Sequence, residues 1–477
     1  MLTASPLGDM SPDEFRRHAH RLVDWIADYL HNNDNYPVLS RVQPGDIARQ
    51  LPASAPEHGE PFDRVLDDFE RTIVPGLTHW NHPGFFAYFA ITGSAPGVLG
   101  EFLSAALNVQ AMLWRTSPAA TELEEVSLGW LRQLIGLPAS FEGVIYDTAS
   151  IASLHALAAA REEAVPDVRG QGLAGRDLPR MRVYCSEHAH SSIDKAVMML
   201  GLGHHSLRRL PADSEFRLDV EALARAVADD RRAGLLPIAA VATVGTTSTT
   251  SVDPVPAIAE LCERERLWLH VDAAYAGVAA MVPGYEHILA GADRAHSLVV
   301  NPHKWLFTPF DLSAFFCRRM DTIRAAFSLT PEYLRNAEAG RARNLMDTGV
   351  QLGRRFRALK LWMILRHFGA EGLRARLREH MRLAQLFAGW VRRDPEFELL
   401  APVPFSVVCF RVKPPNIPPA ELDHYNEALL EKLNASGEVF LSHTKLNGVL
   451  TLRLAIGHIR TEERHVRRAW DLLHDLM

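Results

Sequence analysis

The sequence predicts an α/β protein with a mainly parallel central sheet. In the middle of the chain, short apolar runs alternate with longer helical patterns, which is typical of strands joined by crossover helices. The apolar runs are residues 144–146, 182–185, 238–244, 267–271 and 298–300. Each of them ends in polar residues that can carry chemistry. Because ligands of open α/β sheets bind beyond the carboxyl ends of the strands, we expect a site at this edge.

The beginning of the chain predicts a separate helical segment. Residues 11–14 (SPDE) match a capping box with proline at the first helical position, and apolar residues follow at helical spacing. A proline-rich stretch, residues 51–61, ends this segment. At 477 residues the chain also exceeds the usual size of a single core, so two or three subdomains are expected.

A change of pattern near residue 369 predicts a smaller C-terminal unit. A long amphipathic helix crosses into it, with apolar positions at Leu373, Leu377, Met381, Ala384 and Phe387. Strands are expected near 407–410 and 450–454, and a last helix over 462–477. The expected division is a helical arm at 1–90, a large domain at 91–370 and a small α+β domain at 371–477.

Charge, apolar runs and cysteine spacing argue against nucleic-acid-binding, membrane-spanning and disulfide-linked proteins. The net charge of −6, without a long run of one sign, gives no support to a nucleic-acid partner. No signal peptide is visible, and the longest apolar stretches, such as 235–244, are too short to span a bilayer. The four cysteines are far apart, as expected of reduced thiols in a cytoplasmic protein, and no metal-ligand spacing is found among the 22 histidines.

Lys304 is the first candidate for chemistry. The chain contains 45 Arg but only six Lys, and one of these lies in residues 301–305 (NPHKW), directly after an apolar run. A desolvated lysine can lose its proton and act as an amine nucleophile, which arginine cannot do. Such an amine suits a Schiff base with an aldehyde cofactor. The alternative is a lysine stem that extends from a strand end to solvent.

Asp272 is the second candidate, because it stands where the run 267–271 stops. Pyridoxal phosphate needs an acidic partner for its pyridine nitrogen, since the protonated ring is the electron sink. Asp272 could instead be an ordinary helix N-cap. A lysine and an aspartate that both follow predicted strands favour the cofactor interpretation over either alternative.

The chain resembles the aromatic-L-amino-acid decarboxylase family, the group II pyridoxal-phosphate decarboxylases, nearly from end to end. The resemblance lies in residues 79–83 (HWNHP), 116–124 (TSPAATELE), 189–192 (AHSS), 270–277 (HVDAAYAG), 301–305 (NPHKW) and 352–357 (LGRRFR). It implies fold type I and a homodimer with sites at the interface, in which the N-terminal arm packs on the partner. It also implies decarboxylation of an aromatic L-amino acid, such as tryptophan, phenylalanine, tyrosine or dopa, to its amine.

The resemblance assigns roles around the cofactor ring. Lys304 would hold the cofactor and Asp272 would keep its ring nitrogen protonated. His190 matches the residue that stacks on the ring, although a lone histidine is more often structural. Ala274 matches the small residue on the opposite face, and Thr246 matches a hydroxyl near the cofactor.

A helix N-terminus is expected to bind the cofactor phosphate. Residues 148–150 (TAS) open a helix after a strand, and free amides there form an anion site. The resemblance implies that Ala149 and Ser150 contact the phosphate, with Asn301 and His303 nearby. Capping by Thr148 is the simpler alternative. Many family members have glycine just before this segment, whereas this chain has Asp147, a carboxylate that should be turned away or neutralised.

Residues 328–345 are expected to form a long loop, and such loops are often lids. The resemblance implies that Tyr333 within it donates a proton to the substrate α-carbon. The alternative is an exposed loop tyrosine without a catalytic role. The expected substrate pocket comprises Trp80, Phe89, Ile91, Gln110, Met112 and Gly353. Ile91 removes a hydrogen bond that a threonine could give, and Gly353 leaves space, so a large or weakly hydroxylated ring is favoured over a catechol.

The sequence leaves three enzymatic alternatives and one non-catalytic alternative to consider. In an aldehyde synthase, oxygen would intercept the reaction after decarboxylation, although having both His190 and Tyr333 argues against it. A decarboxylase of a non-aromatic amino acid and an aminotransferase are further enzymatic possibilities. A non-catalytic cofactor-binding protein would be expected to lack Lys304, Asp272 or His190, and all three are present.

Overall fold

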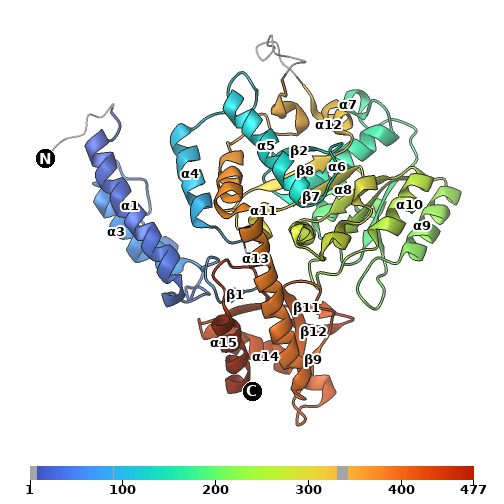
Figure 1. Cartoon of the computed structure of the whole chain (residues 1–477). Coiled ribbons are helices and arrows are strands. Elements are labelled where there is room, and N and C mark those ends of the chain that lie inside the picture. The colour runs from blue at the N-terminus through green and yellow to red at the C-terminus, as the bar shows by residue number, and fades with distance from the viewer. Residues whose placement is uncertain (1–7, 90, 330–341) are drawn as a thin grey trace.

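The computed structural model describes residues 8–89, 91–329 and 342–477. Figure 1 shows a helical arm near the N-terminus, a large sheet covered by helices, and a smaller sheet close to the C-terminus. The long helix α13 (Ala358–Arg393) runs from the large part of the molecule down to the small sheet.

The large sheet has seven strands in the order β2-β8-β7-β6-β5-β3-β4. Neighbouring strands from β4 through β3, β5 and β6 to β7 are parallel, whereas β8 is antiparallel to both β7 and β2. The predicted, mainly parallel α/β sheet is therefore confirmed. The strands are β2 (Glu142–Tyr146), β3 (Met181–Ser186), β4 (Leu207–Leu210), β5 (Leu236–Thr243), β6 (Trp268–Asp272), β7 (Ser297–Val300) and β8 (Ser313–Cys317).

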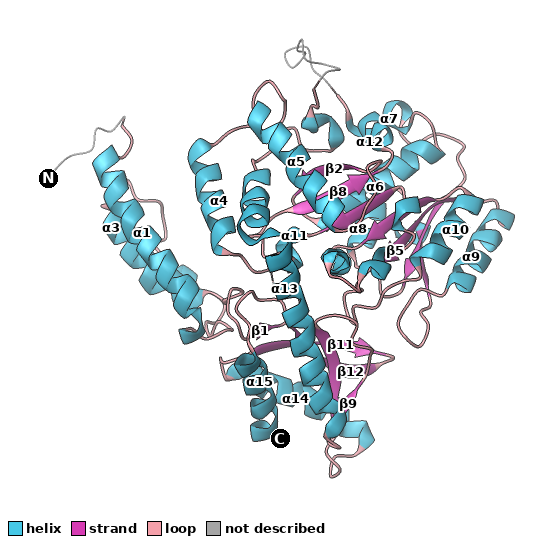
Figure 2. Ribbon diagram, viewed as in Figure 1, coloured by secondary structure: helices cyan, strands magenta, loops and turns pink. Residues whose placement is uncertain are grey.

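Helices cover both faces of this sheet (Figure 2). Helix α6 packs against β5, β6, β7 and β8, and its residues 152–160, mostly alanines, are all buried. Small side chains bring this helix close to the strands, so its N-terminus is held at the edge where the strands end. The helices of this part are α4 (Ala95–Leu107), α5 (Pro118–Leu134), α6 (Ala149–Ala164), α7 (Val168–Gln171), α8 (Ser192–Met199), α9 (Val220–Arg232), α10 (Val255–Glu265), α11 (Pro302–Trp305) and α12 (Met320–Phe327).

The small sheet has the order β1-β11-β12-β10-β9 and is antiparallel except for the β1–β11 pair. The predicted C-terminal strands and final helix correspond to β10, β12 and α15. Because β1 comes from the expected arm, the division at residues 90 and 370 stays a prediction. The elements are β1 (Phe85–Phe86), β9 (Phe397–Leu399), β10 (Val407–Val412), β11 (Phe440–Leu446), β12 (Val449–Ala455), α14 (Leu422–Ala435) and α15 (Glu463–Leu476).

Helix α13 joins the two sheets and contains one break. Gly369 has φ of 62°, in the left-handed region that favours glycine, so two helical stretches meet there. The second stretch is the predicted amphipathic helix, and its five expected apolar residues are all buried. The change of pattern near residue 369 therefore marked a break within a longer helix.

The N-terminal arm consists of α1 (Pro12–Asn32), α2 (Asp46–Gln50) and α3 (Phe62–Asp68). The Ser11 hydroxyl accepts a hydrogen bond from the Glu14 amide at 3.3 Å, which is the predicted N-cap. In Figure 1, α1 and α3 extend away from both sheets. None of the described helices combines the length and the apolar character that a membrane crossing requires.

Candidate active site

A cavity of about 160 Å³ lies where β5, β6 and β7 end, against the first turn of α6. This is the edge of the sheet where the sequence predicted a site. The predicted residues that line it are Phe89, Ala149, Ser150, His190, Asp272, Ala274, Asn301, His303 and Lys304. The further lining residues are Thr148, Thr243, Gly245, Thr247 and Tyr275.

Lys304 lies on α11, the single helical turn that follows β7. Burial lowers the pKa of its amine, and the nearby Asp272 carboxylate opposes that shift. The Nζ atom lies 5.2 Å from the centroid of the Phe89 ring. An amine held in such surroundings is easier to deprotonate than an exposed lysine, which is what a nucleophile requires.

Asp272 is the last residue of β6 and is 6% exposed. Its Oδ1 atom accepts a hydrogen bond from the Ala274 amide at 3.1 Å, while its backbone carbonyl accepts one from the Val244 amide at 2.9 Å. The strand pairing and the turn together fix the carboxylate at the cavity wall. A carboxylate held there can pair with a cationic group of a ligand.

His190 precedes α8 and contributes an imidazole to the lining of the cavity. Its Nδ1 atom accepts a hydrogen bond from the Ser192 amide at 3.1 Å, so the ring proton of the neutral form belongs on Nε2. Burial lowers the pKa of His190, and Asp272 raises it by a smaller amount. The ring is therefore mainly neutral near pH 7 and offers an N–H donor.

The first turn of α6 carries amide groups without a side-chain cap. The Thr148 hydroxyl does not cap the helix but donates to Asp147 Oδ1 at 3.2 Å. The capping alternative for Thr148 therefore does not hold, and the amides beside Ala149 and Ser150 remain available to an anion.

The Asp147 carboxylate beside this turn accepts hydrogen bonds at both of its oxygens. Its Oδ1 atom also accepts from the Thr148 amide at 2.6 Å, and its Oδ2 atom accepts from the Gln351 side chain at 3.2 Å. Both oxygens are thus engaged by donors of the protein. The departure from glycine at this position is compatible with an anion at α6.

Two further donors line the same cavity. Asn301 Oδ1 accepts from the Ser313 hydroxyl at 2.7 Å, which leaves its amide N–H groups as donors. His303 Nδ1 accepts from the Leu312 amide at 2.9 Å, and burial lowers the pKa of this ring to about 3. His303 is therefore a neutral Nε2–H donor at physiological pH.

The structure places Thr247, rather than the predicted Thr246, on the cavity wall. Thr246 is fully buried, and its hydroxyl is hydrogen-bonded to Thr249 at 2.9 Å and to the Ser251 amide at 3.0 Å. It supports the turn after β5 from inside. The resemblance implied a hydroxyl near the cofactor at Thr246, and that role stays a prediction, because Thr247 is the neighbour that lines the cavity.

Arg453 is a supporting residue that the sequence reasoning missed. It comes from β12, is 4% exposed, and donates to the carbonyls of Thr247 and Ser248 at 2.8 Å each. Its guanidinium carbon lies 5.5 Å from the Phe89 ring centroid. No ion pair to a carboxylate is recorded for Arg453 within the described residues. The small domain therefore holds two segments of the cavity wall through one buried cation.

Phe89 and its neighbours form an aromatic wall. The Phe89 and Tyr275 rings stack with centroids 4.0 Å apart, and Tyr275 stacks on Trp305 at 4.9 Å. The Tyr275 hydroxyl is hydrogen-bonded at 2.5 Å to Ser406, which precedes β10. These stacked rings lie beside Lys304 and give the cavity a flat apolar side.

The other expected substrate residues do not line this cavity within the single chain. Gln110 Oε1 accepts from the Arg354 amide at 2.6 Å, and a Cβ atom on Gly353 would lie 3.2 Å from Gln110 Nε2, so these residues form a group of their own. Met112 packs near them against Leu113 and Met346, Trp80 stacks on Phe85, and Ile91 is half-buried. Tyr333 lies outside the described residues.

A family model described as the pyridoxal-dependent decarboxylase conserved domain matches residues 44–413. The chain belongs to this family. It is therefore a carboxy-lyase that depends on pyridoxal phosphate, which confirms the enzyme class and cofactor expected from the sequence.

Relatives of this decarboxylase extend over almost its whole length. A phenylacetaldehyde synthase of Arabidopsis thaliana is 42% identical over 98% of this chain and 97% of the relative. An aromatic-L-amino-acid decarboxylase of Catharanthus roseus is 39% identical over 100% and 96%. The crystal structure of Oryza sativa TDC with PLP and tryptamine has a TM-score of 0.95 and 38% identity, and covers 99% of both chains.

The cavity of this decarboxylase fits pyridoxal phosphate by its donor set. The uncapped turn of α6, with Asn301 and His303, supplies donors for a phosphate at one end. Lys304 can meet an aldehyde, and Asp272 can pair with a protonated ring nitrogen. Among the described residues, no group of three or more His, Cys, Asp or Glu side chains is arranged to hold a metal ion.

Proposed function

We propose that this enzyme converts an aromatic L-amino acid to the corresponding arylalkylamine and carbon dioxide. The observation that carries the proposal is one cavity that contains a lysine with a burial-lowered pKa, a strand-end carboxylate and a neutral imidazole. The aromatic wall of Phe89 and Tyr275 supports an aromatic side chain in the substrate. The Catharanthus roseus structure described as a complex of tryptophan decarboxylase with L-tryptophan, at a TM-score of 0.91, supports the same substrate class.

Four of the residues that line the cavity, Lys304, Asp272, Ala149 and Ser150, have the following tasks in this proposal. When bound, the cofactor supplies the electron sink that allows the α-carboxylate to leave as carbon dioxide. Lys304 would hold the cofactor covalently and would give up that position to the substrate amine. Asp272 keeps a proton on the ring nitrogen, and the anion end at Ala149 and Ser150 fixes the opposite side.

His190 and Tyr333 complete the proposed roles. His190 lines the cavity with its Nε2–H as the free donor, and it would stack on the cofactor ring and orient the substrate carboxylate. As the bond from the α-carbon to the carboxylate breaks, one proton must be added to the α-carbon to give the amine. We assign this proton to Tyr333, with Lys304 as the residue that regains the cofactor afterwards.

The substrate pocket is proposed to be completed by a second copy of the chain. Helix α4 carries four exposed apolar side chains, namely Leu99, Phe102, Leu103 and Leu107. A contiguous apolar helix face is typical of a protein interface. In the proposed homodimer, Gln110 and Met112 reach the partner's cavity, while Trp80, Ile91 and Gly353 shape the entrance. The cytoplasmic location is proposed from four unpaired, buried cysteines.

An aldehyde synthase is the second candidate, because a relative with that name is 42% identical to this chain. In that reaction the amino acid, dioxygen and water give aldehyde, carbon dioxide, ammonia and hydrogen peroxide. Incubation of the holoenzyme with tryptophan, phenylalanine, tyrosine and dopa, with assays for amine and peroxide, separates the two functions. Amine without stoichiometric peroxide supports the decarboxylase, whereas equal aldehyde and peroxide would establish the synthase.

A further inference from the structure

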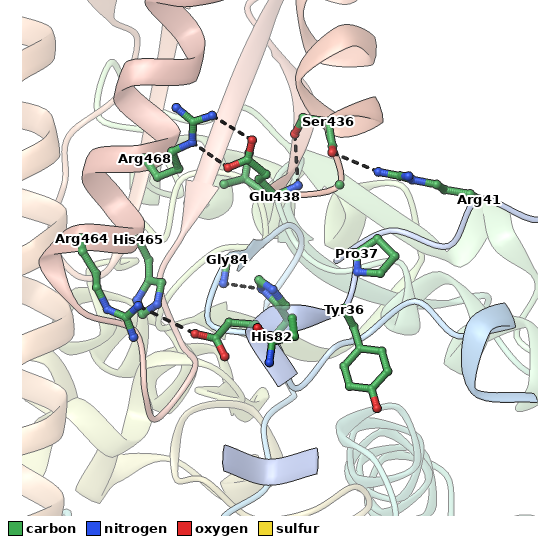
Figure 3. A pocket seen from close by; sticks show the side chains of 14 residues that line it. Tyr36, Pro37, Arg41, His82, Gly84, Ser436, Glu438, Arg464, His465 and Arg468 are labelled. Carbon is green, nitrogen blue, oxygen red and sulfur yellow. Dashed lines mark hydrogen bonds and ion pairs between the residues drawn. The ribbon is translucent and has the colours of Figure 1, made fainter. Parts of the chain in front are cut away.

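A second, larger cavity lies at the junction of the N-terminal arm and the small domain (Figure 3). Its volume is about 590 Å³, which is within the usual range for sites of small organic ligands. We call it the junction cavity. Its wall combines residues 34–37 and Arg41 with His82 and Gly84, residues 436–439, and the first turns of α15. It shares no lining residue with the cofactor cavity.

Two arginines and a neutral histidine border the junction cavity at a helix N-terminus; burial lowers the pKa of His465 to about 4. Arg464, His465 and Arg468 occupy the first two turns of α15, where the helix dipole already favours negative charge. Arg468 is neutralised by a bidentate ion pair with Glu438, at 2.7 and 2.8 Å. The Arg464 side chain is 65% exposed, and its Nε atom donates to Glu462 at 2.9 Å. Its Nη1 atom lies 3.8 Å from the carboxylate of Asp34, which also lines the cavity, so its Nη2 atom is the donor left for a ligand.

Arg41 supplies positive charge from the other side of the junction cavity. Its guanidinium donates to the Ser436 carbonyl at 3.2 Å, and no carboxylate partner for it is recorded in the described part of the chain. Gly437 allows this position, because a Cβ atom there would come within 2.7 Å of the Arg41 nitrogen. Figure 3 shows Arg41 on one side of the cavity and Arg464 with His465 on the other.

His465 provides an independent indication of a ligand. Its Nδ1 atom accepts a hydrogen bond from the Glu462 amide at 2.9 Å, so the proton of the neutral ring belongs on Nε2. That Nε2 atom is buried and has no acceptor among the described residues. A buried donor without a partner is unfavourable, and an oxygen of a bound anion would satisfy it.

We propose that the junction cavity binds a small organic oxyanion, whose carboxylate or phosphate groups contact Arg41 on one side and Arg464 and His465 on the other. Arginine suits such groups because its planar, permanently charged fork forms paired hydrogen bonds with them. The bound molecule would connect residues 34–41 at the base of the arm to the small domain, and so stabilise the placement of the arm. This inference does not depend on the proposed substrate.

Calorimetric titration of the cofactor-saturated enzyme tests the proposal. Citrate and glycerol 3-phosphate serve as the two probes, in sodium chloride of matched ionic strength, and saturating cofactor keeps the probes out of the cofactor's anion site. We expect saturable binding of at least one probe and a saturable rise in melting temperature. The probe that binds more tightly identifies the ligand as carboxylate or phosphate. Absence of saturable binding by both would overturn the proposal.

Two variants and a matched control locate the binding. Arg41→Gln and Arg464→Gln should each raise the dissociation constant of the probe about ten-fold, because each removes a charge-assisted contact. Arg64→Gln removes an exposed arginine of the arm that pairs with Glu60, outside the junction cavity, and should leave the constant within about two-fold. All three should decarboxylate at the wild-type rate without ligand. Equal affinity in all of them would show that the anion binds elsewhere.

Discussion

The two cavities of this enzyme differ in the kind of cation that they contain. The cofactor cavity, of about 160 Å³, holds a buried lysine whose pKa is lowered, at the ends of parallel strands. The junction cavity, of about 590 Å³, is bordered by arginines on loops and one helix. Arginine keeps its charge and binds anions, whereas a desolvated lysine can become a nucleophile. Burial of a titratable amine, and not cavity size, therefore distinguishes the site of covalent chemistry.

Replacement of Lys304 should give the largest effect. Lys304→Ala should lower decarboxylation by about a thousand-fold or more, because no other residue of the cavity can hold the cofactor covalently. Borohydride should attach the cofactor to the peptide that contains Lys304 in the wild type, and to none in the variant. Lys195→Ala, on the surface of α8, is the matched control. Attachment at another lysine would refute the assignment.

Replacement of Tyr333 should change the products. Tyr333→Phe should lower amine formation by about a hundred-fold, because the proposed proton donor to the α-carbon is lost. Substrate binding should remain, since the cavity residues are untouched, and the unprotonated α-carbon should react with oxygen. Amine, aldehyde and peroxide are measured together. If the variant forms amine at the wild-type rate and no peroxide, Tyr333 is not the proton donor. His190 would then be the first residue to test for that role.

Replacement of Asp272 should separate cofactor binding from turnover. Asp272→Asn retains the shape of the side chain but cannot keep the ring nitrogen protonated. The loss of one charge-assisted contact corresponds to about 1.5–3 kcal/mol, or roughly a ten- to hundred-fold fall in turnover. Cofactor content is measured by absorbance and turnover by carbon dioxide release. Turnover within a few-fold of the wild type would contradict the assigned role.

Replacement of Arg453 tests whether the small domain positions the cofactor cavity. Arg453→Met should raise KM by about five- to twenty-fold with a smaller change in kcat, because Phe89 and Thr247 lose a shared support. Arg453→Lys should raise KM by less than Arg453→Met but should not restore the wild-type value, since one ammonium group cannot reach all the carbonyls. Arg411→Met, which breaks an ion pair with Glu398 inside the small domain, is the control. The same KM change in the control would indicate a general loss of stability.

Acid should destabilise the enzyme modestly through its buried histidines. Burial lowers the pKa of His270 and His380 to about 4, from an ordinary value of 6.5. Between the two values the unfolded chain binds more protons than the folded one, so the free energy of unfolding falls as pH drops below about 6.5. Each histidine should lower the free energy of unfolding by about 1 kcal/mol between pH ~7.5 and ~5.5. Urea unfolding at both pH values measures this, and a rise in stability at the lower pH would contradict it.

Local sequence was sufficient to predict those residues of the cofactor cavity that directly follow strands. Lys304 and Asp272 each stand at the end of an apolar run, and parallel strands bring their carboxyl ends to one edge of the sheet. The helix start at this edge was also predictable, because α6 begins shortly after β2, whereas its role as a phosphate site stays a prediction. The choice between Thr246 and Thr247 was not predictable, since it depends on the course of a single turn.

The sequence by itself determined the fold class, the family and the chemical groups of the cofactor cavity, because each follows from short patterns along one stretch of chain. Only the tertiary structure decided that Thr148 leaves α6 uncapped, that Asp147 accepts a hydrogen bond from Gln351, and that Arg453 supports the cavity from β12. It also brought Arg41 and His465 to the junction cavity. These contacts join residues that are far apart in sequence, and burial and hydrogen bonding between such residues exist only once the chain has folded.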